Sequence, residues 1–176
     1  YEIYCDLGSQ RHLWRVLSEA GREFGLRPFG MRAMMSLRLD RFFGSWQREF
    51  SQDYTAAETG LDRFIAFGKN GDFIGRAAAE QERDAGPARR LCAFDVDADD
   101  ADVVAWEPIW HQDGVVGFCT SGGYSHWQDR SIAFGLVPAE LASEDLEVEI
   151  EILGELRRAR RLAQPPFDPH GQRMRA

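Results

Sequence analysis

The chain has 176 residues, a formal net charge of −8 and a hydrophobic content of 44%. This hydrophobic share is enough to fill a core, which excludes disorder over most of the chain, and the length suits one domain or two small ones. No apolar run approaches the roughly 20 residues of a membrane helix, and the first residues lack a secretion-signal pattern. We therefore expect no membrane partner.

The charge is distributed unevenly. Residues 1–85 carry 13 acidic and 12 basic side chains, whereas residues 86–176 carry 16 and 9. The second half would repel a polyanion, so we expect no nucleic-acid partner. The one basic cluster, "RRARR" at 157–161, continues a strand-like segment, which favours a salt-bridged strand end over a nucleic-acid patch.

The cysteines and histidines predict neither a disulfide framework nor a metal site. Cys5, Cys92 and Cys119 are far apart in the chain and odd in number. None of the four histidines has metal-ligand spacing to another. Three scattered thiols are typical of a reducing compartment, and we expect a cytoplasmic protein.

Three helices are predicted in the first half. The first begins at a Ser9 cap, has apolar residues at spacings of three and four, and ends at Gly25, so we expect it to pack on an apolar surface. The second covers 30–39, and its methionines are expected to fill a core. The third covers 72–84, with Asp72 as its N-cap.

The pattern changes at "AGP", residues 85–87, after which the chain reads as short strands. A hairpin is expected in 107–121, turning at an Asp113-Gly114 type I′ turn. Residues 146–152, "LEVEIEI", alternate cleanly between apolar and acidic. Further strands are predicted at 89–98 and 131–138. Strands of this kind favour a small barrel or sandwich.

The segment 120–129, "TSGGYSHWQD", concentrates serines, a histidine and an aspartate. Closeness in sequence does not bring a catalytic triad together in space, and no helix follows the glycines to form a phosphate loop. We therefore expect a structural corner, in which Gly122 and Gly123 supply turn freedom between strands.

Several phrases, taken in order, resemble one family. They are "GLRPFGMRAMMSLRLD" (25–40), "DYTAAETGL" (53–61), "GDFIGRAA" (71–78), "EPI" (107–109), "VVGFCTSGGYS" (115–125), "SIAFGLVPAELA" (131–142), "VEIEILGE" (148–155) and "PPFDPHGQRMR" (165–175). Together they resemble the glycine-cleavage T-protein (aminomethyltransferase) family, and more closely the folate-binding end of dimethylglycine and sarcosine dehydrogenases.

The resemblance implies an α+β fold. Residues 1–86 would form the C-terminal part of the folate-binding aminomethyltransferase domain, and residues 87–176 a small C-terminal antiparallel β-barrel. It also implies that the chain, which starts at Tyr1, is a segment of a longer protein that lacks the N-terminal part of its folate domain. A flavin domain carrying FAD would belong to that missing part.

The resemblance further implies a tetrahydrofolate cofactor and a one-carbon donor derived from a methylated amine. Asp40 ends the "SLRLD" phrase where the family has glutamate, and its carboxylate would accept the two N–H groups of a pterin edge. Lys69 would balance negative charge on the folate, and the Trp46 indole would wall the pterin pocket. Each has a structural alternative: a helix-end carboxylate, an exposed lysine beside a turn, and a tryptophan packed at a domain junction.

Two other motif residues have structural roles in this interpretation. Glu58 is expected to shape its turn by hydrogen bonding, and Arg38 to pair with a nearby acid. No residue matches the family's catalytic aspartate, so the catalytic group is unknown and the segment alone is expected to be inactive. The departures Met35 and Ala56, with the shortened Asp40, leave open a non-catalytic module that binds a ligand or partner.

Overall fold

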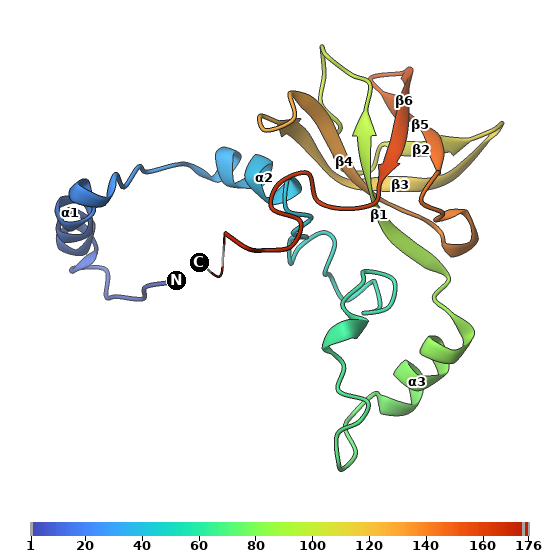
Figure 1. The fold of residues 1–176 in the computed structure, drawn as a ribbon, viewed down its shortest axis with the longest axis horizontal. Coiled ribbons are helices and arrows are strands. Elements are labelled where there is room, and N and C mark those ends of the chain that lie inside the picture. Colours follow the sequence, from blue (N-terminus) through green and yellow to red (C-terminus); the bar gives the residue numbers. More distant parts are fainter. Residues whose placement is uncertain (1, 174, 176) are drawn as a thin grey trace. The chain divides into compact units, whose positions relative to one another are not determined.

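The computed structural model describes residues 2–173 and 175 of the chain (Figure 1). The chain forms two compact units, Tyr1–Ala33 and Met34–Ala176. The first contains helix α1 (Gln10–Ala20), and the second contains an antiparallel barrel. Helix α2 (Met31–Leu39) begins in the first unit and ends in the second.

Helix α1 has the predicted start, but it ends at Ala20, before the predicted stop at Gly25. Ser9 occupies the N-cap position, although its side chain makes no capping hydrogen bond. A 3₁₀ turn, η1 (Arg22–Phe24), follows, and Gly25 closes it in the left-handed region at φ 70°. No residue of α1 is buried, so the described residues of this unit do not supply the apolar partner that its periodicity predicts.

Helix α2 matches the predicted range of 30–39, but its methionines do not fill a core. Met31 is 68% exposed and Met34 is also exposed. The apolar contact of α2 is made at its other end by Leu39, which packs beside Ile132 and Phe134 of the barrel. The helix is therefore attached to the barrel through its last turn.

Helix α3 (Arg76–Ala85) begins later than predicted, after the 3₁₀ turn η2 (Asp62–Phe64). The N-cap is Gly75, which has φ 87°, so the prediction of Asp72 as the cap is wrong. Asp72 instead accepts a hydrogen bond from the amide of the next residue, Phe73, at 2.9 Å. A left-handed glycine lets the chain turn sharply into the helix without the penalty that a side chain would carry.

The predicted barrel is confirmed. Its strands are β1 (Arg89–Val96), β2 (Pro108–His111), β3 (Gly114–Ser125), β4 (Arg130–Pro138), β5 (Glu147–Ile152) and β6 (Glu155–Leu162), with a 3₁₀ turn η3 (Ala139–Leu141) before β5. They close in the order β1-β4-β3-β2-β5-β6, and every pair is antiparallel (Figure 1). Closure pairs both edges of every strand, which leaves no open sheet edge in the barrel.

The alternation in 146–152 has the predicted consequence. Val148, Ile150 and Ile152 are buried in the barrel core, and the glutamates between them face outward. In β6, Arg158 and Arg160 lie opposite Glu149 and Glu147 of β5. The basic cluster is thus a strand with opposite charges across from it, as expected.

Two turn predictions are wrong. His111 pairs with Gly114, so the hairpin loop consists of Gln112 and Asp113, and only Gln112 has a positive φ, at 56°. Gly122 and Gly123 lie inside β3 instead of in a turn. A Cβ on Gly122 would come within 2.3 Å of the Val103 carbonyl oxygen, so this glycine allows close approach of two backbones.

Candidate functional site

The acidic side chain predicted to contact a pterin lies where α2 meets the barrel. Asp40 directly follows α2 and is 4% exposed. Ser125, the last residue of β3, donates its hydroxyl to Asp40 Oδ1, and the Asp40 carbonyl accepts a hydrogen bond from Phe167 N at 3.1 Å. Ser125 Oγ also accepts from Gln128 N at 3.1 Å, which fixes the hydroxyl. The carboxylate is therefore held in one orientation.

A second contact joins the same two elements. Ser36, one turn before Asp40, donates its hydroxyl to the carbonyl of Tyr124. Ser36 in α2 and Asp40 directly after it thus bind the last two residues of β3, Tyr124 and Ser125. Because these bonds and the buried Leu39 act together, the end of α2 is fixed to a rigid part of the fold.

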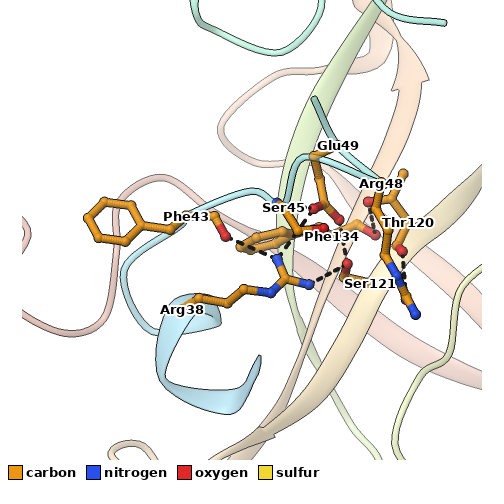
Figure 2. Close-up of polar contacts among 8 residues, drawn as sticks. All are labelled: Arg38, Phe43, Ser45, Arg48, Glu49, Thr120, Ser121 and Phe134. Atoms are coloured by element: carbon orange, nitrogen blue, oxygen red, sulfur yellow. Dashed lines mark hydrogen bonds and ion pairs between the residues drawn. The ribbon is translucent and has the colours of Figure 1, made fainter. Parts of the chain in front are cut away.

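The same helical turn carries a buried arginine, shown in Figure 2. Arg38 donates to Glu49 Oε2 at 3.3 Å, to Ser121 Oγ at 2.6 Å and to the Phe43 carbonyl at 3.0 Å. Its guanidinium also lies over the ring of Phe134, 5.7 Å from the centroid. The expected acid partner of Arg38 is therefore confirmed, and it is Glu49.

Glu49 is completely buried and fully engaged. It accepts hydrogen bonds from Ser45 N at 2.7 Å and from the Ser121 hydroxyl (Figure 2). Desolvation by itself would raise the pKa of Glu49, but hydrogen bonds from Ser121, Ser45 and Thr120, with the charge of Arg38, outweigh it and lower that pKa. Desolvation lowers the pKa of Arg38. This ion pair fixes the peptide 43–49 against β3.

Glu58 has the hydrogen-bonding role expected of it. Thr55 N donates to Glu58 Oε2 at 3.0 Å, and Glu58 N donates to Thr55 Oγ1 at 3.1 Å, which is the reciprocal geometry of a capping box. Arg89, at the start of β1, donates to Glu58 Oε1 at 2.8 Å. The segment before η2 is thereby attached to the barrel.

Lys69 lies in an exposed turn between η2 and α3. Its backbone amide donates to the Ala66 carbonyl at 3.0 Å. Within the part of the chain that the structure describes, its ammonium group makes no ion pair or hydrogen bond. Lys69 is therefore an exposed lysine beside a turn in this chain.

Trp46 is 75% exposed, and its indole contacts no other aromatic ring among residues 2–173 and 175. The alternative of a tryptophan packed at a junction is thus not realised within the described residues. No hydrogen bond, ion pair or ring contact joins Asp40, Trp46 and Lys69 to one another. The structure fixes one of the three predicted site residues firmly and leaves two exposed.

Three surface cavities of the barrel unit, with volumes of about 830, 240 and 210 Å³, are lined by other residues. The first lies along β1, β2, β5 and β6 and combines carboxylates with arginines such as Arg158 and Arg160. No group of three His, Cys, Asp or Glu side chains among the described residues is arranged to hold a metal ion. Nor is any helix among those residues long and apolar enough to cross a membrane.

Residues 120–129 do not form the expected corner, because 120–125 end strand β3 and only 126–129 make the turn into β4. Ser125 binds Asp40, the Tyr124 hydroxyl binds Asp129, and the His126 ring packs edge-on against the Tyr124 ring, 5.1 Å between centroids. Serine, histidine and aspartate therefore do not form a relay here. The residues that join α2 to β3, namely Ser36, Arg38, Asp40, Glu49, Ser121 and Ser125, form the candidate site platform.

Two family models match the chain. The GCVT N-terminal domain matches residues 1–69, and the glycine cleavage T-protein C-terminal barrel domain matches residues 89–168. The second match covers the closed barrel from β1 to β6.

Curated relatives belong to the same families as the two matching models. The chain is 37% identical over 155 residues to mitochondrial dimethylglycine dehydrogenase from Mus musculus, which covers 88% of this chain and 18% of the relative. It is 31% identical over 165 residues to an aminomethyltransferase from Geobacillus sp. (strain WCH70), covering 94% of this chain and 45% of the relative. The chain thus spans less than half the length of these relatives.

A solved structure shares the fold. The crystal structure of glycine cleavage system aminomethyltransferase T from Bartonella henselae matches with a TM-score of 0.77 at 24% identity, over 87% of this chain and 43% of that one. The two family models and the curated relatives show that this chain belongs to the glycine-cleavage T-protein family. It is similar to aminomethyltransferases and dimethylglycine dehydrogenases.

Proposed function

We propose that this chain is the segment of a tetrahydrofolate-dependent one-carbon transfer protein that closes its folate site, within an enzyme similar to dimethylglycine or sarcosine dehydrogenase. Residues 1–86 would complete the folate-binding domain, and residues 87–176 would form the barrel domain. The observation that carries the proposal is the buried, oriented carboxylate of Asp40 at the end of the "SLRLD" helix.

The chemistry of that carboxylate supports a pterin contact. A pterin edge presents two nearly parallel N–H donors, and an ionised carboxylate has about four acceptor sites on its two oxygens. The hydroxyl of Ser125 uses one of them at Oδ1. Asp40 therefore retains the acceptor capacity for a bidentate contact, and its fixed orientation lowers the entropy lost on binding.

Lys69 and Trp46 would complete the folate contacts. The Lys69 ammonium has no anionic partner among the described residues, and folate carries carboxylates that it can pair with. The exposed face of the Trp46 indole suits stacking on a flat ring. Both side chains are exposed in this chain.

In the full-length protein, a flavin domain with FAD would oxidise an N-methyl amine, and reduced folate would accept the resulting one-carbon unit. This segment's own contribution would be to orient the folate and to exclude water, because an iminium exposed to water hydrolyses to free formaldehyde. Free thiols at Cys5, Cys92 and Cys119 are compatible with the cytoplasm as the proposed compartment.

The test uses the full-length protein with tetrahydrofolate and dimethylglycine under anaerobic conditions with an added electron acceptor. We expect methylenetetrahydrofolate as the product, measured by mass spectrometry, at the expense of free formaldehyde. Formaldehyde formed in the same amount with and without the folate would contradict the proposal. Absence of both folate binding and amine oxidation would favour a non-catalytic module of the same family.

A further inference from the structure

We infer that Arg76 is a positioning residue for Lys69, holding the turn that carries this lysine so that its ammonium is presented to an anionic group of the folate. The inference rests on the proposed function, because the ligand is the one proposed there. Arg76 lies at the start of α3, outside the platform at α2, and it would act by holding the backbone of the turn.

The guanidinium of Arg76 donates hydrogen bonds to three carbonyl groups of one turn. It donates to Phe67 O at 2.7 Å, to Gly71 O at 2.9 Å and to Lys69 O at 3.4 Å. A planar guanidinium has five N–H donors in a rigid fork, so the terminal nitrogens of Arg76 can bind three carbonyls while its Nε binds Glu80. The three carbonyls belong to alternate residues, so the turn is curved around this fork.

Arg76 is itself anchored on a regular element. It is the first residue of α3, and its Nε donates to Glu80 Oε1 at 3.0 Å, one helical turn further on. Its guanidinium also lies 5.6 Å from the centroid of the Phe73 ring. The ion pair is partly exposed and contributes little stability by itself, but it restricts the direction in which the fork points.

The consequence for Lys69 is a hydrogen-bonded backbone with an exposed side chain. Its carbonyl binds Arg76 and its amide binds the Ala66 carbonyl at 3.0 Å. The ammonium has no ion-pair partner in residues 2–173 and 175. A cation on a pre-ordered backbone loses less entropy when it binds an anion than the same cation on a mobile loop. Gly71, at φ 100°, lets the chain leave the turn toward α3.

A double-mutant cycle in the full-length protein tests the inference, with tetrahydrofolate affinity measured by anaerobic titration. Lys69→Ala should weaken binding about fivefold, the scale of a partly exposed ion pair. Arg76→Ala should weaken it about twofold to fivefold in the wild-type background and hardly at all when Lys69 is already alanine, because the two residues act through one contact. Arg63→Ala, which removes an exposed arginine that stacks on Phe64, is the matched control and should leave affinity unchanged.

Hydrogen–deuterium exchange supplies the readout of position. Arg76→Ala should speed exchange of the amides in 67–71 while those in β1–β6 stay protected. Glu80→Gln removes the charge of the anchoring side chain without touching the turn, and it should act in the same direction more weakly. Glu80→Gln also serves as a control for Arg76→Ala, in case that variant unfolds helix α3 as a whole.

The outcomes separate the two claims. Wild-type protein that binds no tetrahydrofolate would overturn the proposed function and this inference with it. Binding that is weakened by Lys69→Ala, with an equal effect of Arg76→Ala in both backgrounds, would overturn only the inference. Unchanged exchange of 67–71 in Arg76→Ala would overturn it as well.

Discussion

Replacing Glu49 by glutamine tests the buried ion pair that supports the α2 platform. Glutamine has nearly the same size and keeps one acceptor oxygen, but it leaves Arg38 charged in a site where its side chain is only 10% exposed and its partner 0%. Breaking a buried pair by removing one charge costs about 3–5 kcal/mol. That is a large share of the total stability of about 5–15 kcal/mol that is typical of a folded domain.

The assay is thermal unfolding of the wild type and of Glu49→Gln at neutral pH and moderate salt. A loss of about 3 kcal/mol lowers the melting temperature of a domain of this size by roughly 6–12 °C. Glu144→Gln, at an exposed position with no ion pair among the described contacts, is the control and should shift it little. If Glu49→Gln melted within about 1 °C of that control, Arg38 and Glu49 would not stabilise the fold as argued.

Three further predictions follow from the described contacts. The folded-state pKa of Glu49 lies below its ordinary value of 4.5. The ionised Glu49 therefore stabilises the fold above about pH 4.5, and this stabilisation is lost as the pH falls through the folded-state pKa. The difference in unfolding free energy between the wild type and Glu49→Gln should narrow below about pH 4.5. Gly122→Ala places a methyl group against the Val103 carbonyl and should cost at least about 1–3 kcal/mol in a urea titration; a neutral result would refute the close approach. Burial raises the thiol pKa of Cys92 and Cys119, so peptide mapping after treatment with iodoacetamide should find both alkylated only once the barrel unfolds, and rapid alkylation in the native state would count against a closed barrel.

Periodicity predicted the strands well where one face of the strand is buried and the other faces solvent. In 146–152 the apolar residues face a core and the glutamates face solvent, so the alternation alone identifies β5. The same holds for 30–39, where the predicted helix and α2 differ by one residue at the start. The local pattern decides β5 because burial of one face dominates its energy, whereas α2 buries only Leu39 and exposes Met31 and Met34.

Local patterns fail where the outcome depends on contacts distant in sequence. Glu49 looks like one more acid in a polar stretch, and only the approach of Ser121, 72 positions later, makes it a buried partner of Arg38. Gly122 has the appearance of a turn residue until the Val103 carbonyl is seen beside it. Asp72 is the preferred N-cap by local sequence, but the backbone path before α3 starts the helix after Gly75.

The site predictions divide in the same way. The ordered phrases of the family placed Asp40 at a helix end, but its burial and its bond with Ser125 depend on the barrel closing against α2. Lys69 was indicated by its match to a basic residue in the family's ordered phrases, whereas the hydrogen bonds of Arg76 to its turn are visible only in three dimensions. The contact of these residues with folate stays a prediction.

Titration of the full-length protein with tetrahydrofolate, for the wild type and for Asp40→Asn, tests the central claim most directly. Asparagine preserves the size of the side chain and can still accept from Ser125, but it replaces one carboxylate oxygen by an NH₂ donor that faces the donors of the pterin. We predict at least a fivefold weaker affinity, about 1 kcal/mol, with little change in affinity for Asp145→Asn at an exposed position. Equal affinities of the wild type and a folded Asp40→Asn protein would contradict the claim that this carboxylate binds the pterin.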